Sequence, residues 1–138
     1  MKKQIRNFVL SAGFAALFSA TVLTAQTKLE VAEVPFEFHV GQTTLSAGNY
    51  TVSHMANQSV IQLRNEETHK TVSIAPIARG NDKGRANLSF RCYGEQCFLS
   101  EVAVAGSPSY MLKKTSLENE TANNGKQATV AYIPVGRR

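Results

Sequence analysis

The two cysteines of this chain stand close together and suggest the first piece of chemistry. Cys92 and Cys97 flank the segment Tyr-Gly-Glu-Gln. If Gly94 and Glu95 form a two-residue turn, the adjoining strands place the cysteines opposite each other in a non-hydrogen-bonded site, with Cα atoms about 4.5 Å apart. A disulfide spans that distance. We therefore predict a structural Cys92–Cys97 disulfide. The alternatives are a zinc pair, which would need two further ligands, and a redox-active or nucleophilic thiol.

Three histidines, His39, His54 and His69, are the side chains best suited to bind a metal ion. They are spaced 15 residues apart, so successive strands could bring them together. No HExxH motif or H-x-H pair accompanies them. His39 is on the outward face of its predicted strand, and His69 falls in a charged turn. We predict three surface histidines and no metal or other cofactor. An exported hydrolase that uses His39, His54, His69 or Glu101 is an alternative.

Glu101 is the carboxylate with the most unusual predicted position. The hairpin register that pairs the cysteines also sets Leu88 opposite Glu101, so a charge would share a face with core residues. We expect an inward charge near the end of a sheet, paired with an arginine such as Arg79 or Arg85. The alternative is that Glu101 lies in a pocket, where it anchors a ligand or acts as an acid or base.

Two charged segments are the candidate binding loops. Residues 79–85 contain two glycines and four charged residues without a large apolar group, and the turn 65–70 is also charged. Loops often carry the residues that recognise partners. The loop residues that we expect to contact a partner are Arg79, Asp82, Lys83, Arg85, Glu66, Glu67 and Lys70.

Other catalytic and nucleic-acid signatures are absent from the sequence. It contains no G-x-S-x-G, P-loop or G-x-G-x-x-G motif. Glu66 and Glu67 are adjacent, so their carboxylates diverge and do not form a catalytic pair. The aromatic residues alternate as core residues do, without the basic residues of a nucleic-acid platform. We therefore predict a protein that is not an enzyme and does not bind nucleic acid.

The first 25 residues have the order of a secretory signal peptide. Lys2, Lys3 and Arg6 precede every acidic residue, and an uncharged, largely apolar run from Phe8 is closed by small residues at Ala25. We predict cleavage after Ala25. The alternative is an uncleaved anchor, since the run is near the shortest that crosses a bilayer.

Residues 26–138 then form one exported domain, located in the periplasm, on the cell surface or in the medium. Twelve of the 15 basic residues and all 10 acidic residues remain after cleavage, so the net charge falls from +5 to +2. The basic character of the whole chain is therefore no argument for nucleic-acid binding. The membrane would be contacted only through an uncleaved signal segment.

The mature chain alternates apolar and polar residues with a period of two, which is typical of half-buried strands. We predict an all-β fold: a small antiparallel β-sandwich or a partly closed barrel, with the sandwich favoured by the regular turn spacing. The seven predicted strands are residues 34–40, 49–52, 59–64, 72–74, 86–93, 96–104 and 127–135.

One short helix is predicted near the C-terminus. The segment Thr115-Ser-Leu-Glu118 has the form of a capping box, with Thr115 as the N-cap and the Glu118 side chain reaching back. The helix would span about 116–123 and end at Gly125, a common helix-stopping residue.

Three phrases of the mature chain resemble a group of small exported bacterial proteins of unknown function. They are Val34-Pro-Phe, LSAGNYTV (45–52) and Tyr93-Gly-Glu followed by FLSE (98–101). The corresponding phrases in the group are VPF-x-F-x-VG, LPAG-x-Y-x-V and RYG-x-x-x-FLSE. The chain departs from that pattern with Ser46 in place of the usual proline and with its two cysteines. These phrases are turn and strand signatures, so the resemblance implies no activity.

Taken together, these features favour an exported, non-catalytic envelope or extracellular module. We expect an unknown protein or cell-envelope partner, recognised through sheet faces, edge strands or loops. A carrier of a small apolar ligand inside a β-barrel is the alternative within binding functions.

Overall fold

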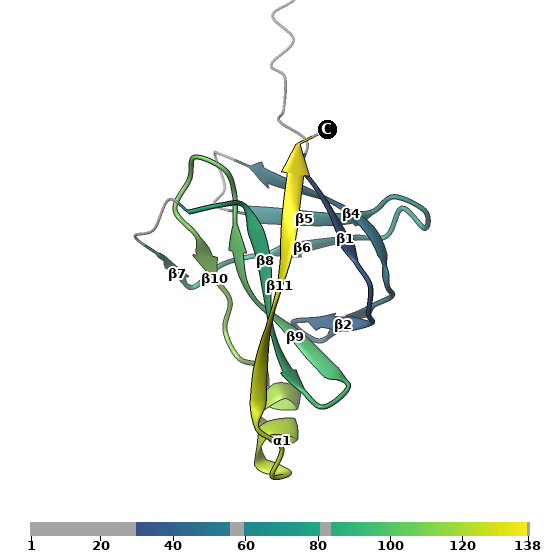
Figure 1. Ribbon diagram of the computed structural model, residues 1–138, viewed down its shortest axis with the longest axis vertical. Coiled ribbons are helices and arrows are strands. Elements are labelled where there is room, and N and C mark those ends of the chain that lie inside the picture. Colours follow the sequence, from purple (N-terminus) through teal and green to yellow (C-terminus); the bar gives the residue numbers. More distant parts are fainter. Residues whose placement is uncertain (1–29, 56–59, 81–83, 138) are drawn as a thin grey trace, which may run out of the picture.

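A computed structural model describes residues 30–55, 60–80 and 84–137 of the chain (Figure 1). The predicted signal peptide, residues 1–25, lies outside the described residues. Strands dominate the rest, and the predicted all-β class with one short helix is confirmed. The elements are β1 (Glu30–Val34), β2 (Phe38–Val40), β3 (Thr43–Leu45), β4 (Gly48–Met55), β5 (Val60–Asn65), β6 (Thr71–Ile74), β7 (Ala78–Arg79), β8 (Asn87–Tyr93), β9 (Gln96–Ala103), β10 (Tyr110–Met111), α1 (Ser116–Asn123) and β11 (Ala128–Arg137).

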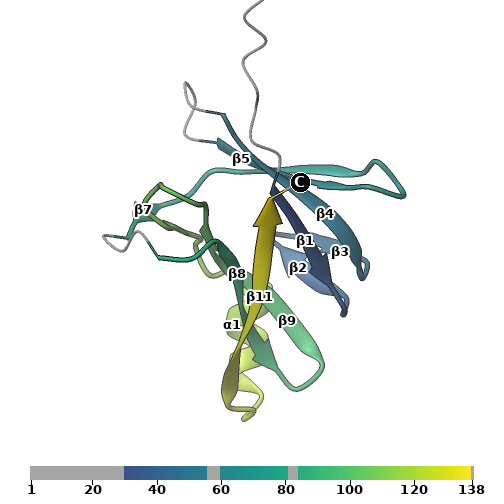
Figure 2. The same ribbon diagram turned by 45° about the horizontal axis from the view of Figure 1, so that its top comes forward.

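The eleven described strands form one curled sheet. Its order is β3-β2-β9-β8-β11-β1-β4-β5-β6, and β10 pairs with both β9 and β7 beside this path. The strand pairs are antiparallel except for β2 and β9, which run parallel. The sheet curls into a nearly closed, barrel-like form (Figures 1 and 2). Of the two predicted forms, the partly closed barrel therefore describes this fold and the favoured sandwich does not, and the described residues contain eleven strands where seven were predicted.

The strand predicted for residues 34–40 is divided in two. β1 pairs with β4 and β11, whereas β2 pairs with β3 and β9. Pro35, between them, has no N–H to donate to a strand ladder. The chain therefore changes neighbours between Val34 and Phe38 while both side chains stay buried.

Aromatic rings fill the centre of the barrel. The Phe38 ring meets the rings of Tyr50 and Phe90 edge to face, each with centroids 5.2 Å apart. Phe36 packs in the same way on Phe90, at 5.1 Å. Such pairs stabilise a core beyond the burial of their area. The aliphatic side chains of Leu45, Ile61, Leu63 and Leu88, all fully buried, complete this part of the core.

The hairpin of β8 and β9 has the predicted register at its tip. Tyr93 lies opposite Gln96 and Cys92 opposite Cys97, with Gly94 and Glu95 as the turn. Gly94 has a φ of 66° while the φ of Glu95 is not positive, which is the pattern of a type II′ turn. The Cys92–Cys97 disulfide is confirmed, with Cα atoms 4.0 Å apart.

Further along the hairpin, the predicted position of Glu101 is wrong. The register shifts between Ser89 and Phe90, so Ser89, not Leu88, lies opposite Glu101. Ser100 is the extra residue of this β-bulge, and its hydroxyl donates to the Ser89 carbonyl at 2.9 Å. A bulge shifts the alternation of side chains by one residue. Glu101 is therefore half-buried, while Leu88 and Val102 pair across the core face.

Helix α1 begins where the capping motif predicts. The Thr115 hydroxyl accepts a hydrogen bond from the Glu118 backbone N–H at 3.2 Å, and Gly125 follows the helix with a φ of 85°. The second half of the capping box is wrong. The Glu118 carboxylate binds Arg91 and Tyr93 of β8 instead of reaching back to the N-cap. A buried carboxylate takes the stronger donors of a neighbouring strand.

Candidate binding site

The ends of the sheet, β3 and β6, each leave a strand edge that pairs with no other described strand. On β6, the Lys70 carbonyl accepts from the Asn65 N–H at 2.9 Å. The backbone groups of every second residue after Lys70, namely Val72 and Ile74, therefore face β5. The backbone N–H and C=O groups of Thr71 and Ser73 must then point away from β5. On β3, the two-residue turn at Gly41 and Gln42 leaves the backbone groups of Thr44 pointing outward in the same way. Exposed edges of this kind are ready to pair with another strand.

The opening between β3 and β6, called the slit below, is closed at one end. Beyond β6 the chain continues to β7, which pairs with β10. The Ile77 N–H donates to the Met111 carbonyl at 3.0 Å, and the Leu112 N–H donates to the backbone carbonyl of Ser100 on β9 at 2.9 Å. These hydrogen bonds join the two walls. The slit therefore runs from this closed end, past Ile74 and Val40, toward Thr44 and Lys70.

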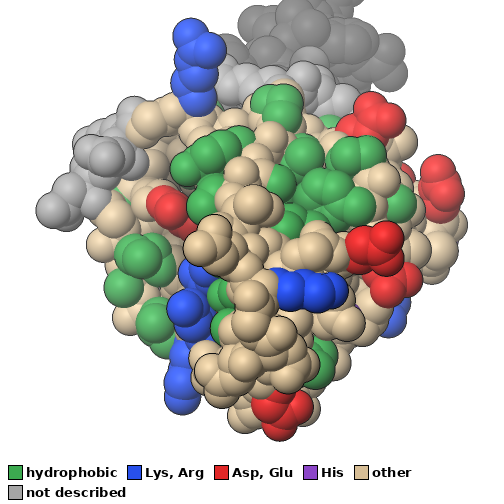
Figure 3. Space-filling model, turned by 60° about the horizontal axis from the view of Figure 1, so that its bottom comes forward, with side chains coloured by type: hydrophobic (Ala, Val, Ile, Leu, Met, Phe, Trp, Pro, Cys, Tyr) green, Lys and Arg blue, Asp and Glu red, His purple; other side chains and the backbone are tan. Residues whose placement is uncertain are grey.

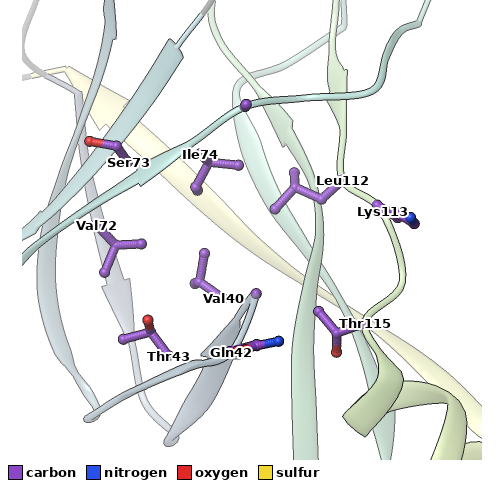
Figure 4. A pocket seen from close by; sticks show the side chains of 11 residues that line it. Val40, Gln42, Thr43, Val72, Ser73, Ile74, Leu112, Lys113 and Thr115 are labelled. Atoms are coloured by element: carbon purple, nitrogen blue, oxygen red, sulfur yellow. The ribbon is translucent and has the colours of Figure 1, made fainter.

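A pocket of about 340 Å³ occupies the slit beside its closed end (Figure 4). Its apolar side chains come from three elements: Val40 from β2, Val72 and Ile74 from β6, and Leu112 after β10. Lys113 is the only charged residue among the described residues that line it. The other lining residues are Gly41, Gln42, Thr43, Ser73, Ala75 and Thr115. An apolar floor with a polar rim is a common composition for a binding pocket.

A second hollow, of about 480 Å³, lies further along the slit. Its described lining residues are Glu37, Thr44, Leu45, Ser46, Tyr50, Thr68 and Lys70. The Lys70 ammonium donates to the outward Thr44 carbonyl at 3.3 Å, which links the two walls. The Tyr50 hydroxyl donates to the Ser46 carbonyl and fixes the chain after β3. The slit thus has two hollows with the Lys70–Thr44 hydrogen bond across it.

A buried ionic network fixes the helix whose N-cap borders the first pocket. Glu118 is only 2% exposed, and its Oε1 accepts from the Nε of Arg91 at 2.5 Å and from the Tyr93 hydroxyl at 3.2 Å. The hydrogen bond with Glu118 raises the pKa of Arg91 above its ordinary value. Burial, followed by the Glu118 charge, raises the pKa of Tyr93. This network positions Thr115 at the rim of the pocket.

The three histidines lie on separate elements. His39 on β2 is bonded to Thr44 at 3.0 Å and stacks on Phe98. His54 on β4 is bonded to the Tyr110 hydroxyl at 3.1 Å. His69, in the turn before β6, has a φ of 60° and is bonded to Arg64. The described residues contain no group of three or more His, Cys, Asp or Glu side chains placed to hold a metal ion.

Glu101 borders a separate small hollow on the sheet. The hollow measures about 150 Å³. The described residues that line it with Glu101 are Gly84, Arg85, Asn87, Ser89, Ala103, Ser109 and Tyr132. Glu101 forms no ion pair with any residue that the structure describes, so the expected partnership with an arginine is not formed.

The candidate binding loops are placed only in part. Asp82 and Lys83 lie outside the described residues, while Arg85 is exposed. The Arg79 guanidinium lies 5.6 Å from the centroid of the Tyr110 ring. In the β5–β6 turn, the Asn65 side chain accepts from the Glu67 N–H at 2.9 Å. Glu66 is half-buried, and Glu67 and Lys70 are exposed. Of these residues, Lys70 lies in the slit.

Hydrophobic side chains also reach the surface outside the two hollows of the slit. Figure 3, with the α1 end brought forward, shows them gathered in a broad patch that has acidic side chains along one border. The large hydrophobic side chains most exposed among the described residues are Ile77, Met111, Leu117, Val130 and Tyr132.

Lys113 and Leu112 line the first pocket but were not among the site residues predicted from the sequence. The only local signal was an apolar residue followed by two lysines at 113–114, and that signal does not reveal which strands lie across from them.

No helix among the described residues is long and apolar enough to cross a membrane. Comparisons with protein families, curated proteins and solved structures find no match.

Proposed function

We propose that this protein is an exported, non-catalytic binding module that takes an extended segment of a partner polypeptide into the slit. The observation that carries the proposal is that β3 and β6, at the two ends of the sheet order, each have an edge with no neighbour among the described strands. A partner strand laid between them would complete the ladder. Main-chain hydrogen bonds would give affinity, and the pocket would select side chains.

The composition of the slit supports a polypeptide ligand. Thr71, Ser73 and Thr44 direct backbone donors and acceptors into the opening, and all three residues are exposed. The apolar floor at Val40 and Ile74 is buried. A strand offers both features at once, since its backbone groups point sideways and alternate side chains point to one face.

The two other functions have less support. A carrier of apolar ligands needs a cavity inside the barrel, but aromatic and aliphatic side chains occupy its centre. A hydrolase needs convergent groups. His39 and His54 lie on β2 and β4, His69 in a turn, and Glu101 on β9, and each has different neighbours.

The test uses proline to block the edge of β6. In the Ser73→Pro variant the outward N–H is lost, while the ladder with β5 keeps its hydrogen bonds. The matched control, Ser73→Ala, keeps the N–H. A library of short peptides of random sequence is incubated with each protein, and retained peptides are identified by mass spectrometry.

We expect the wild type and Ser73→Ala to retain the same peptides, and Ser73→Pro to bind them at least about tenfold more weakly, which corresponds to the loss of about 1.4 kcal/mol. Circular dichroism and urea unfolding check that both variants fold. If no peptide distinguishes the wild type from the proline variant, the proposal is wrong.

Export is the second part of the proposal. The disulfide fits an oxidising compartment, where such bonds persist, and the N-terminal sequence has the order of a signal peptide. N-terminal sequencing of protein recovered from the periplasm or medium should begin at Gln26. Recovery of Met1 in a membrane fraction would favour the uncleaved anchor instead.

A further inference from the structure

The slit differs at its two ends, and this difference indicates which part of a polypeptide it accepts. We propose that it captures the free carboxyl end of an extended segment, with the α-carboxylate at Lys113 and the last large apolar side chain in the adjoining pocket. This inference rests on the proposed function and names the ligand of the same site.

The closed end is the first argument. The hydrogen bond from Ile77 to Met111 joins the walls there, and the pairing of β7 with β10 continues that junction. A strand that enters between β3 and β6 cannot run on in the sheet past this point. The free end of a polypeptide fits the closed end of the slit, whereas an internal segment would have to bend sharply out of the slit.

Charge is the second argument. Lys113 lies directly after Leu112 beside the closed end, and no acidic residue is among the described residues that line the pocket. Lys113 forms no ion pair with any described residue. The exposed Lys113 side chain is long enough to turn its ammonium toward a carboxylate at the rim of the pocket. A charge-assisted hydrogen bond of this kind is among the stronger polar contacts in proteins.

The pocket supplies the third argument. Val40, Val72, Ile74 and Leu112 surround a volume of about 340 Å³, which leaves room for one large aliphatic side chain beside a carboxylate. Figure 4 shows the Ile74 and Leu112 side chains directed toward the same space, with Lys113 at its border and the Lys113 side chain turned outward. An apolar C-terminal residue therefore fits better than a polar one.

These positions also set the direction of the ligand. β6 runs from Thr71 near the Lys70–Thr44 hydrogen bond to Ile74 near the closed end. A segment whose carboxyl end reaches Lys113 must run in the same direction. It would be parallel to β6 and antiparallel to β3.

The experiment uses the peptides that the wild-type protein retains and that the Ser73→Pro variant binds more weakly. Each of these peptides is compared in three forms. The forms are the free acid, the C-terminal amide and the acid extended by two glycines. Their affinities are measured by fluorescence anisotropy with the wild type and with Lys113→Gln. The control is Lys114→Gln, because Lys114 is exposed and does not line the pocket.

We expect the amide and the extended form to bind the wild type about tenfold more weakly than the free acid, the size of a lost hydrogen bond to a charged group. Lys113→Gln should weaken binding of the free acid by a similar factor and leave the amide unchanged within about twofold. Lys114→Gln should change neither. If acid, amide and extended peptides bind equally, capture of the carboxyl end is wrong while the proposed function stands. If no peptide is sensitive to Ser73→Pro, both are wrong.

Discussion

Arg91 on β8 holds the carboxylate of Glu118 on α1 through two hydrogen bonds, from Nε at 2.5 Å and from Nη2 at 3.1 Å. The two residues are 27 positions apart in the sequence. This pair fixes the helix against the strand that also carries Cys92 of the disulfide. The N-cap of the same helix, Thr115, borders the pocket in the slit. The stability of the helix attachment and the shape of the pocket are therefore coupled.

Replacing Glu118 with alanine should destabilise the protein by about 2 kcal/mol, because Arg91 and Tyr93 would lose the acceptor of their hydrogen bonds. Urea unfolding measures the change in the free energy of unfolding. Glu120→Ala is the matched control, since Glu120 is exposed on the same helix, and it should change stability by less than about 0.5 kcal/mol. Equal effects of the two substitutions would contradict the role assigned to Glu118.

Tyr93 should make the stability depend on pH in the alkaline range. Its pKa in the folded protein is raised above the ordinary value of 10.0, so the folded state keeps its proton more tightly than the unfolded chain does. The contribution of the hydroxyl is complete below about pH 10 and is lost as the pH rises through the folded pKa.

Tyr93→Phe tests this dependence. The variant should be about 1 kcal/mol less stable than the wild type near neutral pH. The difference should shrink above about pH 10. Lysine titration affects both proteins equally, so the difference between the two unfolding curves isolates Tyr93. A difference that stayed constant, or grew, up to about pH 11 would contradict the assignment.

The disulfide should add only modest stability. The loop between Cys92 and Cys97 is short, and the loss of chain entropy on closing so short a loop corresponds to about 2 kcal/mol. We expect the double variant Cys92→Ser/Cys97→Ser to fold, with a free energy of unfolding, measured by urea titration, that is lower by that amount. Two freely alkylatable thiols in the native exported protein would show that the bond does not form there.

Features determined by neighbouring residues could be predicted from the sequence. The turn at Gly94 and Glu95 sets which residues pair at the tip of the hairpin, so the disulfide follows from it. The N-cap at Thr115 follows from its spacing to Glu118. In both cases the interacting groups lie within one turn of backbone, and residue type with spacing is sufficient.

Features that join distant segments could not be predicted in this way. The parallel pairing of β2 with β9 and the junction of β7 with β10 shape the slit, yet no local pattern reveals which strands become neighbours. The bulge at Ser100 places Glu101 opposite Ser89 and not opposite Leu88. The residue types of the two strands do not show where such an extra residue falls. Glu118 likewise found partners on a strand far away in the sequence.

Lys70 gives the last prediction, because its ammonium occupies the acceptor that a bound strand would need. It donates to the Thr44 carbonyl at 3.3 Å, and Thr44 presents that carbonyl to the slit. A strand antiparallel to β3 would have to displace this hydrogen bond. Lys70→Met should therefore tighten the binding of free-acid peptides by about two- to fivefold, the value of an exposed charged contact. Lys113→Gln should weaken it in the same fluorescence anisotropy assay. If Lys70→Met also weakened binding, Lys70 would be a direct contact of the ligand and would not compete with it.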